Sequence, residues 1–170
     1  MIGAGPLGRR LALAAARAGY RVQLEDVMPS NLHHAQEYIR QQCGPGAATA
    51  VRFVSTIEDA VRDADLAIDC VPDELESKLE IFCLLDRMAP PRTILATPTT
   101  RLSIADLASC TYRADRCVAI ASEAVALAEG KAGELVMRTA PQTSEETKTL
   151  VGEFWRKLGY APRFEQDGAA

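Results

Sequence analysis

The chain opens with MIGAGPLGRR at residues 1–10, and this stretch decides the fold. Gly3, Gly5 and Gly8 fit the pattern G-x-G-x-x-G. The first glycine permits a tight turn out of a strand, the second lets the backbone approach a pyrophosphate, and the third lets a helix lie close to a sheet. The N-terminus of that helix would offer free N–H groups to phosphates. The stretch therefore predicts a strand, a dinucleotide-binding turn and a helix.

An acidic residue closes the next predicted strand, YRVQLED at residues 20–26. A carboxylate about twenty residues after the glycines can hold both hydroxyls of a ribose. Asp26 and Glu25 compete for this role, and we favour Asp26 because it shares strand parity with Val22 and Leu24. No arginine follows directly to meet a 2′-phosphate, so the pattern indicates NAD rather than NADP.

Helix-like and strand-like segments alternate along the rest of the chain. This alternation predicts βαβ units with right-handed crossovers, and therefore an α/β doubly wound parallel sheet, a Rossmann fold, as a single domain over residues 1–170. The expected helices cover residues 8–18, 31–42, 57–64, 73–89, 103–109 and 144–159. The expected strands cover 20–26, 51–55, 66–71, 93–98, 116–122, 134–138 and 160–164, with a loop at 44–50.

The first strand is unusually short in this sequence. Only Met1 and Ile2 precede the glycine pattern, whereas a strand usually has about five residues. Either the strand is stunted or the natural start lies upstream, and the sequence leaves both alternatives open.

The composition excludes several classes of partner. Nineteen basic residues against 23 acidic ones give a net charge of −4, which argues against nucleic acid or an anionic membrane as partner. We find no run of 18 or more apolar residues and no signal-peptide pattern. The five cysteines are odd in number and form no C-x-x-C pair, which favours reduced thiols in the cytoplasm over disulfides or a metal site.

Three stretches, at residues 1–27, 63–108 and 139–162, resemble the L-3-hydroxyacyl-CoA dehydrogenase family. The middle one, which begins DADLAIDCVPDELESK, is the most specific. The resemblance implies NAD-dependent oxidation of the 3-hydroxyl of an acyl thioester, as in fatty acid metabolism. The cofactor contacts that we expect are Gly3, Gly5, Pro6, Leu7, Gly8, Asp26, Val71, Asp73, Lys78 and Thr97. Two of these have alternatives, because Asp73 could cap a helix and Lys78 could be a solvated helix residue.

The catalytic motif departs from the family pattern. The family's N-T-S-S is replaced by Pro-Thr-Thr-Arg at 98–101, in which Thr100 keeps a hydroxyl for the substrate oxygen. Ala121 stands at the position of the family's general-base histidine and cannot accept a proton. Glu123 could replace that base if burial raised its pKa, and Glu134 lies near the family's orienting glutamate. We therefore expect impaired activity, with Thr100, Glu123 and Glu134 as the catalytic candidates.

Two parts of the family pattern are absent from these 170 residues. One is a helical hairpin between the second and third strands, and the other is the C-terminal helical domain that completes the substrate cleft and forms the dimer. The alternative to an enzyme is thus a catalytically silent NAD-binding module, or a subunit that acts with a partner; a third reading is an interaction domain that binds nothing tightly. Phe154, Trp155 and Leu158 are expected to form an exposed patch for a homodimer or a partner subunit.

Overall fold

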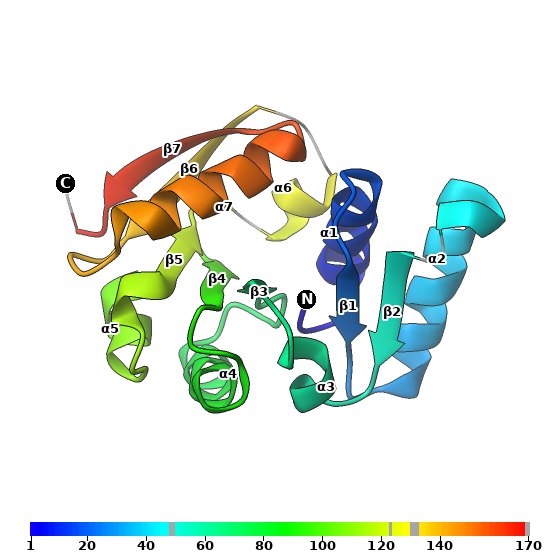
Figure 1. The fold of residues 1–170 in the computed structure, drawn as a ribbon, viewed down its shortest axis with the longest axis horizontal. Coiled ribbons are helices and arrows are strands. Elements are labelled where there is room, and N and C mark those ends of the chain that lie inside the picture. Colours follow the sequence, from blue (N-terminus) through cyan, green and yellow to red (C-terminus); the bar gives the residue numbers. More distant parts are fainter. Residues whose placement is uncertain (48–49, 123, 130–132, 169–170) are drawn as a thin grey trace.

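The computed structural model describes residues 1–47, 50–122, 124–129 and 133–168. The helices are α1 (Pro6–Arg17), α2 (Pro29–Ala47), α3 (Ile57–Val61), α4 (Leu75–Met88), α5 (Ile104–Ser109), the 3₁₀ turn η2 (Ala114–Arg116), α6 (Ala124–Glu129) and α7 (Glu145–Lys157). The strands are β1 (Val22–Glu25), β2 (Val51–Val54), β3 (Leu66–Ile68), β4 (Ile94–Pro98), β5 (Cys117–Ile120), β6 (Glu134–Thr139) and β7 (Ala161–Gln166). The strands form a central layer that helices cover on both faces (Figure 1).

The sheet consists of two parts that meet at the N-terminus. β1 pairs with β2, and the other strands follow one another in the order β3, β4, β5, β6, β7. Ile2 lies between the two parts and bridges both Glu25 of β1 and Asp69, which follows β3. The predicted α/β fold with a parallel sheet is confirmed, except that β6 runs antiparallel to β5.

The short first strand is present as residues 1–3, which lie between β1 and the end of β3. Ile2 donates its N–H to the carbonyl of Ile68 and accepts from the N–H of Cys70. On the other side, Gly3 donates to the carbonyl of Glu25, and the N–H of Glu25 donates to the carbonyl of Met1. Residues 1–3 therefore occupy the central strand position of a doubly wound sheet, in register with both neighbours.

The buried core divides between the two faces of the sheet, because successive strand residues point to opposite sides. In β4, Ile94 and Ala96 join the cluster that includes α1, α2, α6 and α7. Leu95 joins the cluster on the other face, under α3, α4 and α5. A parallel strand covered on both faces is expected to be apolar throughout, and β4 is buried over its whole length.

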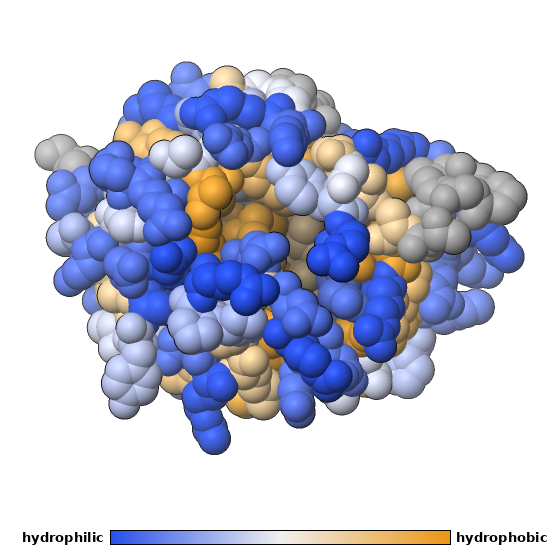
Figure 2. Space-filling view, in the orientation of Figure 1, coloured by the Kyte–Doolittle hydropathy of each residue, from blue (hydrophilic) through white to orange (hydrophobic). Residues whose placement is uncertain are grey.

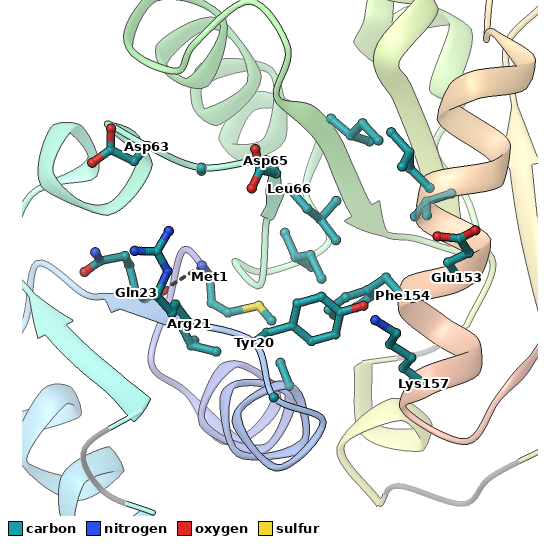
Figure 3. Close-up of a pocket in the computed structure, with 18 of the residues that line it drawn as sticks. Met1, Tyr20, Arg21, Gln23, Asp63, Asp65, Leu66, Glu153, Phe154 and Lys157 are labelled. Carbon is teal, nitrogen blue, oxygen red and sulfur yellow. Dashed lines mark hydrogen bonds between the residues drawn. The ribbon is translucent and has the colours of Figure 1, made fainter.

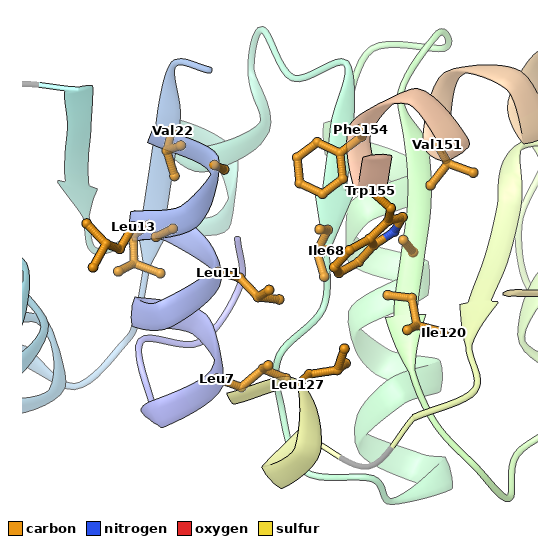
Figure 4. Close-up of a cluster of buried hydrophobic side chains, with 14 of the residues drawn as sticks. Leu7, Leu11, Leu13, Val22, Ile68, Ile120, Leu127, Val151, Phe154 and Trp155 are labelled. Atoms are coloured by element: carbon orange, nitrogen blue, oxygen red, sulfur yellow. The ribbon is translucent and has the colours of Figure 1, made fainter. Parts of the chain in front are cut away.

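The prediction of an exposed apolar patch on α7 is wrong. Phe154 is 7% exposed and Trp155 is fully buried, and Figure 4 shows both among the apolar side chains between α7 and α1. The Phe154 ring lies 5.2 Å from that of Tyr20, and the Trp155 ring lies 5.3 Å from that of Tyr160. The apolar face of α7 therefore packs within the described domain itself.

Most predicted elements are found, and their ends follow local chemistry. Ser144 caps α7 by accepting from the N–H of Thr147, as its position before two glutamates predicted. Residues 44–47 differ from the predicted loop, since they continue α2 to Ala47, and α6 was not expected. Among the described residues, we find no helix that is both long and apolar enough to cross a membrane.

Candidate cofactor-binding site

The glycine turn has the geometry that its sequence predicts. Gly3 adopts a positive φ of 97°, which side chains rarely tolerate. A Cβ on Gly8 would lie 1.8 Å from the carbonyl oxygen of Gly3, so only glycine lets α1 approach the turn this closely. A Cβ on Gly5, by contrast, would meet nothing within 4 Å, so the backbone there faces open space. This open approach to the backbone is what a bulky phosphate group requires.

The N-terminus of α1 follows this open turn directly. Pro6 is its first residue, Gly5 is its N-cap, and no side chain among the described residues caps it. The first-turn N–H groups are therefore left for an external acceptor. Together with the helix dipole, they suit an anion. The residues present thus fit the pyrophosphate of a dinucleotide.

Asp26 lies at the end of β1 and is bonded to the glycine turn. Its Oδ2 accepts from the N–H of Ala4 at 2.8 Å and from Nδ2 of Asn31 at 3.1 Å. Its Oδ1 accepts from the N–H of Met28 at 2.8 Å. The side chain is only 8% exposed, and it holds the turn, the end of β1 and the start of α2 together.

Glu25, the competing acid, lies where β1 pairs with residues 1–3. Its backbone pairs with Met1 and Gly3, and its side chain is buried. Burial, followed by the charge of Asp26, raises the pKa of the Glu25 carboxyl. The structure thus brings Asp26 to the glycine turn and keeps the Glu25 backbone within the sheet.

A buried charged network lies at the carboxyl ends of β3 and β4. Lys78 and Asp69 are both fully buried, and Lys78 Nζ lies 3.1 Å from Asp69 Oδ2. The hydroxyl of Thr97 accepts from Lys78 Nζ at 2.8 Å and donates to Asp69 Oδ2 at 3.0 Å. Asp69 Oδ1 accepts from the N–H of Val71 at 2.9 Å, which fixes the loop after β3.

This network corrects one interpretation and adds one residue. Lys78 is not a solvated helix residue, because its ammonium group is enclosed with Asp69 and Thr97. Burial raises the pKa of the Asp69 carboxyl, and the charge of Lys78 opposes that rise. The sequence analysis missed Asp69, although a carboxylate inside the apolar run at 66–71 was a usable signal.

The loops after β3 and β4 meet beside this network. Asp73 does not cap α4, since the N-cap is Glu74. Its Oδ1 is buried without a hydrogen-bond partner among the described residues, and its carbonyl accepts from Arg101 at 3.2 Å. A buried carboxylate oxygen without a partner is uncommon and calls for a functional explanation.

A second arginine holds the loop that carries Thr100. Arg138 of β6 donates to the carbonyls of Thr99 at 2.8 Å and Leu102 at 3.2 Å. It also pairs with Asp167, whose other oxygen accepts from the Ser103 hydroxyl at 2.7 Å. Nothing in the sequence pattern indicated this clamp, because it joins segments that are distant along the chain.

The segments that carry the proposed catalytic residues adjoin one another at the end of β5, where the N–H of Thr99 donates to the carbonyl of Ile120. Thr100 is exposed in the turn after β4, and Ala121 follows β5 with its N–H donated to the carbonyl of Val136. Glu134 is exposed at the start of β6 and pairs with Arg163 of β7 at 3.0 Å. Glu123 lies outside the described residues. The structure therefore brings together the glycine turn, Asp26 and the loops after β3 and β4, and adds no described base at Ala121.

Comparisons with known proteins agree with this geometry. The profile of the family described as 3-hydroxyacyl-CoA dehydrogenase, NAD binding domain, matches residues 1–163. The chain is 33% identical over 129 residues to a probable 3-hydroxybutyryl-CoA dehydrogenase of Bacillus subtilis (strain 168), which covers 68% of this chain and 45% of that protein. It is 30% identical over 184 residues to the mitochondrial hydroxyacyl-coenzyme A dehydrogenase of Sus scrofa, which covers 95% of this chain and 56% of that protein.

Solved structures show the same fold. The (S)-3-hydroxybutyryl-CoA dehydrogenase PaaH1 from Ralstonia eutropha matches with a TM-score of 0.88 at 20% identity, over 98% of this chain and 62% of that one. The chain spans about half the length of the curated relatives named above. The profile match covers nearly all of the chain and includes the glycine turn, Asp26 and the loops after β3 and β4. The chain therefore belongs to the 3-hydroxyacyl-CoA dehydrogenase family and corresponds to its NAD-binding domain.

Proposed function

We propose that the glycine turn, the first turn of α1 and Asp26 hold NAD, and that the chain takes part in the oxidation of a 3-hydroxyacyl thioester. The observation that carries this proposal is the open backbone at Gly5, next to an uncapped helix N-terminus and a carboxylate bonded to the same turn. When bound, NAD supplies the acceptor for a hydride. The protein's part is to bind the pyrophosphate and the ribose and to orient the cofactor.

The roles within the proposed site follow from position. The N–H groups of Leu7 and Gly8 would donate to the pyrophosphate, and Asp26 would accept from ribose hydroxyls. Val71 and Asp73, on the loop after β3, would line the nicotinamide side, and Thr97 would support that side from beneath, since its hydroxyl is bonded within the buried network. Lys78 would act there through Asp69 and the Val71 loop, because its ammonium is already bonded within the fold.

The catalytic part of the proposal rests on Thr100. Its hydroxyl would donate to the substrate oxygen from the loop that Arg138 holds. Glu123, or water, would accept the proton that the family's histidine takes, with Glu134 nearby. Without a positioned base, turnover would be about 10²- to 10⁴-fold slower. We accordingly propose an impaired oxidoreductase that acts in fatty acid metabolism in the cytoplasm, where thiols such as those of Cys70 and Cys83 stay reduced.

A second candidate function is supported by one observation, the alanine at position 121. In this case the chain is a catalytically silent NAD-binding module, or a subunit whose partner supplies the missing groups. A homodimer would serve the same purpose if the second copy completed the substrate cleft.

Titration of NADH, followed by its fluorescence, tests the shared part of both functions. We expect Asp26→Asn to weaken NADH binding on the order of tenfold or more, because a charged hydrogen-bond acceptor for the ribose is lost. Asn31→Ala is the matched control, since it removes a contact to Asp26 and keeps the carboxylate. Equal affinities of the two variants, with unchanged thermal midpoints, would contradict the proposal.

Addition of acetoacetyl-CoA to the NADH complex then separates the two functions. Slow oxidation of NADH that Thr100→Ala abolishes supports the impaired enzyme. Binding of NADH without turnover supports the silent module. Turnover that Thr100→Ala leaves unchanged would exclude the role proposed for this hydroxyl.

A further inference from the structure

The described thiols do not gather at the cavity of the domain. This cavity, of about 600 Å³, lies at the end of the sheet opposite the glycine turn, and Figure 3 shows Tyr20 and Phe154 beside it. Figure 2 shows a hollow on this face, with an apolar floor and a hydrophilic rim. Among the described residues that line the cavity there is no cysteine or histidine. Three thiols lie instead where α4, α5 and the start of β5 meet, on Cys83, Cys110 and Cys117.

Two of these thiols each lie against the backbone of the other's helix. Cys83, in the middle of α4, has its Sγ 3.8 Å from the carbonyl oxygen of Cys110, the C-cap residue of α5. Cys110 in return has its Sγ 3.9 Å from the carbonyl oxygen of Leu79, one turn before Cys83 on α4. The two helices lie side by side on the same face of the sheet (Figure 1). Both sulfur atoms therefore belong to a single contact between α4 and α5.

The direction of the Cys83 side chain brings the two sulfur atoms together. Side chains of an α-helix lean toward its N-terminus, so Cys83 leans toward the turn of Leu79, against which the Cys110 thiol lies. The pKa of the Cys110 thiol is raised to about 12, first by burial and then by the hydrogen bond and the charge that the Cys83 thiol contributes. Thiols that share a hydrogen bond need only a small side-chain movement to become bonded.

Exposure and hydrogen bonding give the thiols different parts to play. Cys83 and Cys110 are partly exposed, whereas Cys117 is fully buried, with its Sγ 3.4 Å from the carbonyl oxygen of Arg113. Oxidants reach exposed thiols first. The Cys110 thiol donates to the carbonyl of Leu107 at 3.0 Å, while the contact of Cys83 Sγ with its acceptor is longer, at 3.8 Å. Cys83 therefore holds its proton less firmly and is the better first nucleophile.

We propose that Cys83 and Cys110 form a reversible disulfide when the protein meets hydrogen peroxide. The Cys83 sulfur attacks the peroxide, an S–O bond forms, the O–O bond breaks, and the thiol proton leaves with the departing hydroxide as water. The Cys110 sulfur then attacks this sulfenic acid, the S–S bond forms, the S–O bond breaks, and the second thiol proton leaves in a second water. Two electrons pass from the sulfur atoms to the peroxide. A low-molecular-weight thiol restores the dithiol by exchange and is itself oxidised to a disulfide.

This disulfide would join the two helices that follow the loops of the proposed cofactor site. The loop after β3, with Asp73, leads into α4, and the loop after β4, with Thr100, leads into α5. The bond would span 27 positions of the sequence, so it would restrict the unfolded chain and stabilise the folded one. The proposal does not depend on NAD binding, and the dithiol is the resting form in a reducing cytoplasm.

A peptide map of the peroxide-treated protein tests the bond directly. After near-equimolar peroxide and alkylation of the remaining thiols, trypsin places Cys83 in the peptide 79–87 and Cys110 in the peptide 102–113, while Cys117 begins a third peptide. We expect the peptides 79–87 and 102–113 to be linked, and dithiothreitol to separate them. Cys117→Ala is the matched control that keeps this link, and Cys83→Ser should abolish it.

Thermal unfolding gives a second readout. We expect oxidation to raise the thermal midpoint of the unsubstituted protein and of Cys117→Ala by roughly 5 °C, dithiothreitol to reverse the rise, and Cys83→Ser to show none. A link from Cys110 to Cys117, a link between two copies of the chain, or sulfinic acid at Cys83 without any link would each overturn the proposal. Thiols that all stay reduced would overturn it too. The peptide map uses the unsubstituted chain, so its result stands even where a variant fails to fold.

Discussion

A methyl group added at Gly5 or at Gly8, on either side of the start of α1, would meet different surroundings. At position 8 it would overlap the carbonyl of Gly3, and at position 5 it would enter open space. We predict that Gly8→Ala lowers the free energy of unfolding by about 2 kcal/mol or more, because the helix must move away from the turn. Gly5→Ala is predicted to change it by less than about 1 kcal/mol, since φ is −64° there.

Urea unfolding of both variants, together with NADH titration, checks this contrast. The Cβ at position 5 would stand where the pyrophosphate approaches, so Gly5→Ala should weaken binding of NADH while the fold persists. Equal losses of stability in the two variants would show that the turn does not have the described geometry.

The conformation or burial of a single residue could be predicted from the sequence where it depends on residues that are close along the chain. The turn at Gly3 and the close approach at Gly8 follow from the spacing of the glycines, and the structure confirms both conformations. The burial of Lys78 could not be predicted, because it depends on Asp69 and Thr97, which lie on two neighbouring strands. The cofactor contacts themselves stay predictions.

At the scale of elements, the pair of Lys78 and Asp69 joins α4 to β3. We predict that Lys78→Met lowers the free energy of unfolding by about 3–5 kcal/mol, because it leaves a buried carboxylate without its cation. The double variant Asp69→Asn/Lys78→Met should lose less than Lys78→Met alone, since an amide can still bond Val71 and Thr97.

Denaturant unfolding of the two single variants and the double variant completes this cycle. If the two single losses simply add in the double variant, the groups are not coupled, and the network has no role in joining α4 to the sheet.

The presence and the ends of helices and strands with strong local signals could be predicted from the sequence. The direction of a strand within the sheet could not. Ser144 caps α7 through the N–H of Thr147, only three residues away, so the local sequence indicates where α7 starts. β6 was predicted as a strand, yet its antiparallel pairing with β5 depends on how the chain returns after α6. The end of α2 was mispredicted because Gly44, Pro45 and Gly46 favour turns, which a final helical turn can override.

For the whole molecule, the free energy of unfolding is expected to fall in alkaline solution, because buried thiols lose their protons there only in the unfolded state; urea unfolding at several pH values measures this fall. Burial raises the pKa of Cys70 and of Cys117 from 9.0 to about 12. The folded state keeps these protons above pH 9 while the unfolded state releases them, so the free energy of unfolding should fall there. Cys70→Ala should make that decline shallower. A free energy of unfolding that stays constant between pH 7 and pH 10 would contradict both assignments.

The last strand of the sheet has a consequence for how these molecules behave in crowded solution. Ala161 donates to the carbonyl of Gly133, just before β6, and Asp167 donates to that of Thr139, so by alternation the backbone of Pro162 faces outward, where it has no N–H to offer. Arg163 and Glu165 add charge along the same strand. A second sheet cannot readily extend this border, and fibre-like stacking through β7 is disfavoured even when the protein is concentrated.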